Sequence, residues 1–338
     1  MPNLKSDRGN EDIVQQMNKF THLIDLAADR TGGKTLECSD DFFAPMDNLL
    51  KSGRGIFIED KYTDHGKWMD GWESRRKRVE GHDWVVLKLG LRGVIAGVDI
   101  DTNHFLGNHP PHASLEAACV TGTPSNNDWA EILSTIPLEP GSQNLYEIDS
   151  DKEWTHLRLH IYPDGGVARL KVFGEVKPDW SVISKDDLLD LVAVENGGRV
   201  LSCNDMFFSH KDNLIMPNRG ANMGDGWETK RRRGPGHDWS ILKLGHAGTT
   251  KTIEVDTCHF KGNFPDRCSI QSIYAPDVRD DRLEELNWQA LLAETKLSAD
   301  KQHYFESELL HHNKITHLRF NIFPDGGISR LRINGCIG

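Results

Sequence analysis

The sequence of 338 residues contains no long apolar run and no Cys-x-x-Cys pair. A membrane-spanning helix needs about 20 consecutive apolar residues, and the polar opening residues 1–12 do not resemble a signal peptide. The spacing of the six cysteines argues against a zinc knuckle and, without an export signal, against disulfides. We therefore expect a cytoplasmic protein with reduced cysteines and no membrane partner.

Positive charge is also scarce. Lys and Arg number 40 against 51 Asp and Glu, for a formal net charge of -11, which argues against a nucleic-acid partner. An anionic ligand must therefore meet a local basic cluster. The chain is 37% hydrophobic, with 9 Trp and 13 Phe, so it can build packed cores rather than remain disordered. Its length predicts two domains.

An internal duplication organises the chain. Four sequence blocks occur twice in the same order, which chance similarity does not produce. The blocks are 36–43 with 201–208, 70–84 with 225–239, 101–108 with 256–263, and 155–170 with 316–331. The duplication predicts an N-terminal extension (1–20), a first repeat (21–174), a linker (175–183) and a second repeat (184–336).

Within a repeat the pattern is that of β-structure. Residues 84–89 and 94–100 are expected to form two strands, the second half-buried with Asp99 and Asp101 on its polar face. The Pro-Asp-Gly-Gly turn after 157–161 predicts a hairpin with 167–173. An apolar stripe predicts a helix over 283–296. Short strands with Gly-rich turns favour an all-β fold of two tandem jelly-roll sandwiches.

A basic cluster lies in a predicted loop of each repeat. It covers 75–78 in the first copy and 230–233 in the second, after Glu73 or Glu228 and before His82 or His237. A guanidinium fork suits a carboxylate, so the clusters are candidate anion clamps. The alternative is a solvated strand edge whose charges discourage association.

Two Asp-x-x-His pairs end predicted strands, Asp101 with His104 and Asp256 with His259. A carboxylate beside an imidazole can tune a general base or acid. Alternatively, the Asp side chains form turn hydrogen bonds while each His packs on the following Phe. Metal ligation is a third interpretation, although the sequence contains neither a His-Glu-x-x-His pattern nor a manganese-binding motif of the Asp-Ala-His-x-Asp type.

Other polar residues and cysteines of the repeats can have purely structural or solvent-facing roles. His156 and Arg158, with His317 and Arg319 in the second copy, lie on the polar face of a strand and either line a pocket or meet solvent. Cys38 and Cys203 lack a nearby His, which favours small core residues over nucleophiles.

The duplicated motif set closely resembles the allantoicase family. The resemblance covers about 21–336 and rests on Asp-Gly-Trp-Glu, Gly-His-Asp-Trp, Asp-Thr-x-His-Phe-x-Gly-Asn and Thr-His-Leu-Arg followed by Pro-Asp-Gly-Gly. It implies two galactose-binding-like jelly rolls, conversion of allantoate and water into ureidoglycolate and urea in purine catabolism, and a homo-oligomer. The copies also differ, for example with Gln271 in place of Glu116 and Asn321 in place of His160, so the two loop ends need not be equivalent.

Allantoate carries one carboxylate and two ureido groups, so its site needs cations, hydrogen-bond acceptors and groups that move protons. The substrate-binding candidates are Arg75, Arg76, Arg231, Asn108, Asn263, His82 and His237. The catalytic candidates are His104, Asp101, His259, Asp256, Glu73 and Glu228. We expect no cofactor, with a divalent cation as the alternative. Two rival functions stay open: a non-catalytic tandem carbohydrate- or ligand-binding protein, and a hydrolase of another ureide.

Overall fold

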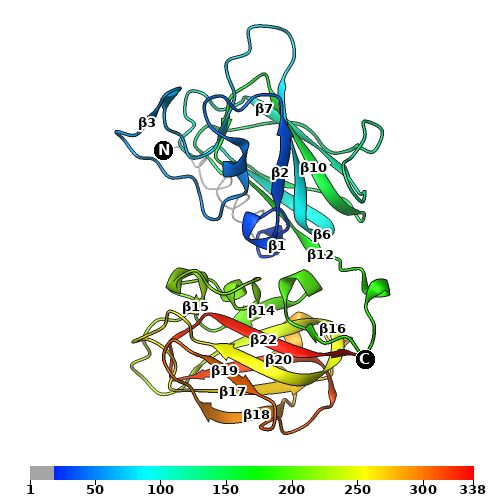
Figure 1. Cartoon of the computed structure of the whole chain (residues 1–338), viewed down its shortest axis with the longest axis vertical. Coiled ribbons are helices and arrows are strands. Elements are labelled where there is room, and N and C mark those ends of the chain that lie inside the picture. Colours follow the sequence, from blue (N-terminus) through cyan, green and yellow to red (C-terminus); the bar gives the residue numbers. More distant parts are fainter. Residues whose placement is uncertain (1–18) are drawn as a thin grey trace, which may run out of the picture. The chain divides into compact units, whose positions relative to one another are not determined.

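The computed structural model describes residues 19–338, so the predicted extension 1–20 lies almost wholly outside the described residues. The chain divides between Lys177 and Pro178 into two compact units, each a β-sandwich (Figure 1). The division falls inside the segment 175–183 that the sequence marks as a linker. No helix within residues 19–338 has the length and apolar character of a membrane span.

The first unit is built around one sheet path with the strand order β1-β12-β6-β10-β7-β8, and β2 and β9 also pair with β6. Its pairings are antiparallel. The strands are β1 (Ile24–Asp25), β2 (Lys34–Cys38), β6 (Asp83–Asp101), β7 (His112–Ala118), β8 (Ala130–Pro137), β9 (Leu145–Glu147), β10 (Glu153–Tyr162) and β12 (Arg169–Val176). Two small ribbons pair β5 (Trp72–Glu73) with β11 (Gly166–Val167) and β3 (Tyr62–Thr63) with β4 (Gly66–Lys67). Short 3-10 helices are η1 (Asp29–Thr31) and η2 (Met46–Leu50).

Strand β6 belongs to both layers of the sandwich. Its first half pairs with β2 and β10, and its second half pairs with β12 and β9. Glycines allow the close approach at the bend, because a Cβ on Gly90 would lie 2.5 Å from the Gly33 nitrogen and one on Gly93 would lie 2.2 Å from the Glu175 oxygen. The two strands expected at 84–89 and 94–100 are therefore one continuous strand.

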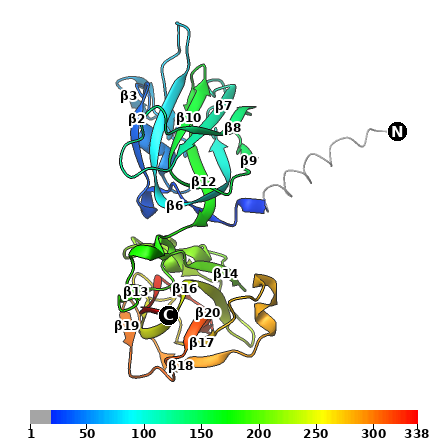
Figure 2. The same cartoon turned by 90° about the vertical axis from the view of Figure 1, so that its right-hand side faces the viewer.

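The second unit repeats this architecture with the order β13-β22-β16-β20-β17-β18, and β14 and β19 pair with β16 (Figure 2). Its strands are β13 (Leu189–Asp190), β14 (Arg199–Cys203), β16 (Asp238–Asp256), β17 (Arg267–Ile273), β18 (Gln289–Lys296), β19 (Gln302–Phe305), β20 (Lys314–Phe323) and β22 (Arg330–Ile337), with a ribbon of β15 (Trp227–Glu228) and β21 (Gly327–Ile328). The 3-10 helices are η3 (Trp180–Val182), η4 (Val194–Asn196), η5 (Lys211–Ile215), η6 (Met223–Asp225) and η7 (Asp280–Glu285). The predicted all-β class of two tandem jelly rolls is confirmed.

The structure corrects two local predictions. Strands β10 and β12 do not form a hairpin: each pairs with a different half of β6, so the Pro-Asp-Gly-Gly turn carries the chain from one layer to the other. The segment 283–296 does not form the predicted helix. It contains the end of η7 and, after a short connection, the whole of strand β18. Pairing of β18 with β17 buries both Leu291 and Leu292, and this tertiary contact overrides the local helical spacing.

Candidate functional site

The turn after β10 holds both ends of the loop 74–82 and the loop that contains Asn108. The amides of Ser74 and Asp83 each donate to a carbonyl of the turn 163–166 at 3.1 Å, and the amide of Gly166 donates to the Asn108 carbonyl at 2.8 Å. Each of these loops carries residues from the duplicated blocks. The turn therefore positions the loop ends that the sequence marks as functional.

Glycine is required at both ends of this contact. Gly165 has φ +140, and a Cβ there would lie 2.6 Å from the Asn108 oxygen. A Cβ on Gly166 would lie 2.0 Å from the buried ring of Phe105. The corresponding glycines of the second unit meet the same constraint, which gives the Pro-Asp-Gly-Gly motif its physical reason.

Glu73 and Asn108 meet beside this turn. Glu73 pairs with Gly166 in the β5–β11 ribbon, and its Oε1 accepts a 2.6 Å hydrogen bond from the Asn108 amide. Burial raises the pKa of Glu73, although the bond from Asn108 opposes the shift. In the second unit the Asn263 amide donates to Glu228 in the same way. The structure therefore brings together a partly buried carboxyl group and an amide at each predicted site.

The basic cluster of the first unit is only partly neutralised. Arg75 pairs with Asp40 at 2.5 Å, and Lys77 pairs with Asp83 at 2.7 Å. Arg76 is exposed and, within residues 19–338, has no ion-pair partner. It is therefore available to an incoming anion.

The basic cluster of the second unit surrounds a pocket of about 200 Å³. Its lining residues are Asp205, Lys230, Arg231, Arg232, Arg233, Gly234 and Asp238. One wall is fixed because the indole of the buried Trp227 donates to the Asp205 carbonyl at 2.8 Å. Arg232 is paired with Asp238, whereas Arg231 is exposed and lacks an ion pair in the described part of the chain. The pocket has the size and charge for a small carboxylate.

His82 begins a chain of polar side chains on the outer face of the first sheet. Its Nε2 lies 2.8 Å from Nδ1 of His160, whose Nε2 lies 2.8 Å from Oε2 of Glu116. The Arg158 Nε donates to the same carboxylate oxygen at 2.7 Å. His160 and Glu116 were not among the predicted site residues. The sequence did contain a signal for them, because the second copy has Gln271 and Asn321 at the corresponding positions.

In the second unit this chain is replaced by neutral groups. His237 Nε2 lies 3.2 Å from Oδ1 of Asn321. The Asn321 amide in turn donates to Ser269 at 3.2 Å and to Gln271 at 3.4 Å. The geometry is similar in both units, but the second contains one titratable side chain where the first has three.

The structure separates Asp101 from His104. Arg54 binds both carboxylate oxygens of Asp101 at 2.7 Å, and the amide of Asn103 donates to the same carboxylate at 2.9 Å. His104 is exposed in a left-handed conformation (φ 68), with its ring 5.6 Å from that of Phe57. The expected dyad therefore does not form, and the turn hydrogen bond of the alternative interpretation does.

Asp256 and His259 likewise bind different partners in the second unit. Arg219 binds both Glu254 and Asp256, the latter at 3.1 Å. His259 turns away, with its Nε2 2.7 Å from the Gly220 carbonyl. Arg54 and Arg219 were not among the predicted site residues, although they occupy corresponding positions after the repeated Asp-Asn-Leu.

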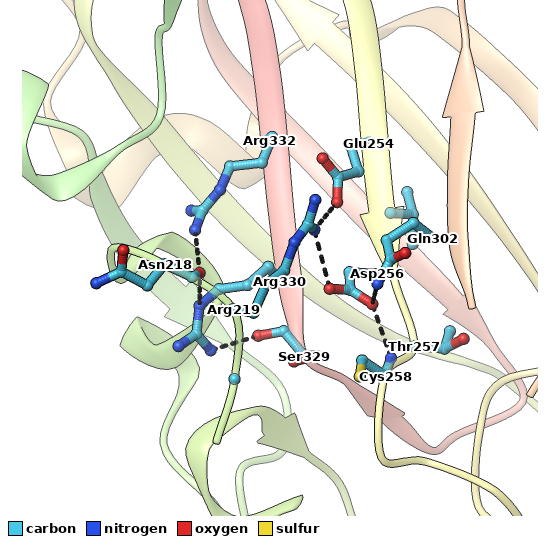
Figure 3. A network of polar contacts seen from close by, with 12 residues as sticks. Asn218, Arg219, Glu254, Asp256, Thr257, Cys258, Gln302, Ser329, Arg330 and Arg332 are labelled. Atoms are coloured by element: carbon cyan, nitrogen blue, oxygen red, sulfur yellow. Dashed lines mark hydrogen bonds and ion pairs between the residues drawn. The ribbon is translucent and has the colours of Figure 1, made fainter. Parts of the chain in front are cut away.

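These buried carboxylates hold loops through ion pairs and backbone hydrogen bonds. Asp99 and Asp101 are 1% and 0% exposed, which corrects the expectation of a half-buried strand with a polar face. In the second unit, Arg330 and Arg332 both donate to the Asn218 carbonyl, at 3.2 and 2.9 Å (Figure 3). The loop that carries Arg219 is therefore held against the strand end.

Cysteine thiols and clusters of metal-ligating side chains are two further kinds of candidate site. The six cysteines are free, and burial raises the pKa of Cys38 and of Cys203 to about 11. Both are therefore protonated thiols near neutral pH, as expected of packing residues rather than nucleophiles. Within residues 19–338, no three His, Cys, Asp or Glu side chains gather as metal ligands.

Comparison with known proteins agrees with the duplicated architecture. The family model described as "Allantoicase repeat" matches residues 24–177 and 189–337. The chain belongs to the allantoicase family. It is 51% identical over 324 residues to "Probable allantoicase 1" of Burkholderia mallei (94% of this chain, 96% of the relative) and 48% identical over 329 residues to "Probable allantoicase" of Acinetobacter baumannii (96% of each). The resemblance drawn from the motifs is thus confirmed.

Solved allantoicase structures share the fold. The crystal structure of allantoicase from Saccharomyces cerevisiae has a TM-score of 0.80 at 33% identity and covers 96% of this chain and 98% of its own. A second allantoicase structure has a TM-score of 0.81 at 32% identity, with 99% and 100% covered. The tandem jelly rolls of this allantoicase family member are therefore shared over nearly the whole chain.

Proposed function

We propose that this allantoicase family member hydrolyses allantoate to ureidoglycolate and urea, and that the loop ends gathered by the turn 163–166 and by its counterpart 324–327 bind the substrate. The family match in both repeats, over nearly the whole chain, carries the proposal for the reaction. In the first unit, the basic cluster, Glu73 and the start of β6 after His82 all bond to one turn, which supports the location.

The substrate carboxylate is assigned to the cations that lack a protein partner. Arg76 and Arg231 can each offer a planar fork of two parallel N–H groups. The Glu73–Asn108 and Glu228–Asn263 pairs can accept from the ureido N–H groups and donate to the ureido carbonyls. Binding by both kinds of group would place the central carbon of the substrate beside the turn.

The reaction breaks one C–N bond at that carbon and forms one C–O bond. A base takes a proton from water as its oxygen bonds to the carbon, and an acid gives a proton to the nitrogen that leaves as urea. Glu73 suits the acid because its raised pKa favours the protonated carboxyl group. His82 suits the base because its pKa is lowered, chiefly by burial. We propose that these groups move the protons without a cofactor.

The test is release of urea from allantoate by the purified full chain, with a glyoxylate assay for decay of the second product. Allantoin, arginine and ureidoglycolate are the comparison substrates. Turnover of one of these in place of allantoate would assign the protein to another ureide reaction. Binding of simple sugars without any hydrolysis would instead support the ligand-binding alternative.

Two further properties are part of the proposal. We place the protein in the cytoplasm, which agrees with its six free cysteines. We also propose a homo-oligomer, on the strength of the family resemblance. Fractionation of the native host cell and light scattering of the purified protein test these two statements.

A further inference from the structure

We propose that turnover is confined to the first repeat, where His82 acts as the general base and His160 and Glu116 position and support it. The inference rests on the proposed hydrolysis of allantoate and adds which repeat performs it. His82 is the catalytic residue in this assignment, because it would face the attacking water. His160 and Glu116 act through it.

The hydrogen-bonded chain from His82 to Glu116 determines which imidazole nitrogens carry protons. Hydrogen bonds from His160 and Arg158 lower the pKa of Glu116 despite its partial burial, so this group is an ionised acceptor. His160 therefore carries its proton on Nε2 and presents a lone pair at Nδ1. That lone pair accepts from Nε2 of His82, which leaves Nδ1 of neutral His82 with a lone pair and able to take a proton.

A positive charge forms on the imidazole of His82 during the proposed reaction. When His82 takes a proton from water, the positive charge lies two hydrogen bonds from the Glu116 carboxylate. A carboxylate at the end of such a chain both fixes the tautomer and stabilises the imidazolium. Arg158 keeps this carboxylate in place, and its guanidinium is itself stacked over Trp129 at 4.7 Å.

The surroundings keep His82 in its neutral form near neutral pH. The titratable and charged groups around it are His160, Glu116, Arg158, Lys77, Asp83 and Tyr162. Burial lowers the pKa of His82 and the neighbouring His160 lowers it further, whereas Asp83 opposes the shift. Asp83 is itself paired with Lys77 at 2.7 Å. His82 is thus available as a base.

The second repeat has the geometry without the charge. Asn321 accepts from Nε2 of His237 and so favours the same tautomer. However, Asn321 and Gln271 are neutral, and neither can stabilise a proton on His237 as a carboxylate does. Arg319, which corresponds to Arg158, is stacked over Trp239 at 4.9 Å. This repeat keeps its basic pocket but lacks the supported base.

The first experiment compares His82→Asn with the matched variant His237→Asn. We expect the His82 variant to lose at least roughly a hundredfold in kcat with KM little changed, in line with general-base catalysis. The His237 variant should lose much less kcat than the His82 variant, because no carboxylate supports a proton on His237. Wild-type urea release is measured first, so an inactive wild type would count against the proposed function and not against this assignment. Equal losses in both variants, or no loss in the His82 variant, would overturn it.

The second experiment gives the first repeat the residues of the second. His160→Asn and Glu116→Gln place side chains that the same scaffold already holds in the second unit, so folding should survive; circular dichroism and thermal unfolding check this. We expect Glu116→Gln to lower kcat by roughly tenfold, since its loss weakens the base. Removing the negative charge also disfavours the imidazolium, so the acidic limb of the pH profile should move to lower pH. A merely structural Glu116 would leave that limb in place, and an unmoved limb would therefore contradict the proposal.

Discussion

At the scale of single residues, the site is selected by which charges remain unpaired. Each basic run has four members, but Arg75, Lys77 and Arg232 already bind a carboxylate of their own unit. These pairs fix the loop. Within residues 19–338, the other five members form no ion pair, and Arg76 and Arg231 are the two that we assign to the substrate: Arg76, Arg78, Lys230, Arg231 and Arg233. A run of like charges in the sequence thus contains two kinds of residue with different tasks.

The guanidinium of Arg76 can be tested by shape as well as by charge. We expect Arg76→Ala to lower kcat/KM for allantoate by roughly ten- to a hundredfold, the effect of losing charge-assisted hydrogen bonds. Arg76→Lys should restore only part of it, because an ammonium cannot make two parallel bonds. Steady-state urea release measures both, and Arg75→Ala, which removes a residue already paired with Asp40, is the control. Wild-type activity in folded Arg76→Ala would assign this residue to solvent.

At the scale of elements, the turn between β10 and β11 decides the arrangement of the site. It links the two layers of the sandwich and holds the loops before β6 and after β6. Glycine is required in this turn because the backbone near Asn108 and the Phe105 ring approach it closely. The backbone hydrogen bonds of the turn also bring Glu73 and Asn108 together. Site geometry and the stability of this corner therefore depend on the same residues.

Gly166→Ala should damage both properties. The added methyl group would meet the Phe105 ring, and overpacking of this kind costs about 1–3 kcal/mol of unfolding free energy. We also expect kcat to fall, because Glu73 pairs with Gly166. Gly107→Ala is the matched control, since a Cβ there meets nothing within 4 Å and its φ is not in the left-handed region. Denaturant unfolding and urea release are measured on both variants. Equal unfolding free energies and equal kcat values would show that the Phe105 ring shifts to accept the methyl group, which would contradict the prediction.

At the scale of the whole molecule, an acidic chain carries a local cluster of cations in each repeat. The formal net charge of -11 disfavours anionic partners in general, but the exposed arginines of each repeat provide a local exception. The duplication doubles this feature, whereas the titratable chain from His82 occurs in the first repeat alone within residues 19–338. Doubling of a fold therefore does not require doubling of its chemistry.

Chelation tests the proton-transfer route on the full chain. If His82 and Glu73 move the protons, prolonged treatment with a chelator followed by its removal should leave urea release unchanged. A metal-activated water would behave differently, because activity would vanish and return with added manganese or zinc. Metal analysis of the purified protein accompanies the assay, and one bound ion per active chain together with such a loss would replace the proposed route.

Much of the molecule could be predicted from the sequence. The ordered repeated blocks identify the duplication, the alternating apolar pattern and Gly-rich turns indicate β-sandwiches, and the motif set points to the family. These features are readable because backbone conformation and burial follow local patterns of residue type. The same locality explains why the predicted hairpin 157–173 and the predicted helix 283–296 were wrong: strand pairing partners, such as β17 for β18, lie outside any local window.

Side-chain partners in the site were decided by the tertiary structure. Asp101 and His104 are close in the chain, yet the strand end and a left-handed turn point them apart, and Arg54, 47 residues earlier, takes the carboxylate. His82 and His160 are 78 residues apart and Glu116 and His160 are 44 apart, yet they form one hydrogen-bonded chain. Sheet register sets which side chains face one another across strands, and that register is a property of the assembled sandwich. The sequence by itself determined the repeats, the fold class and the family, while the three-dimensional pairing of strands decided which acids and bases meet.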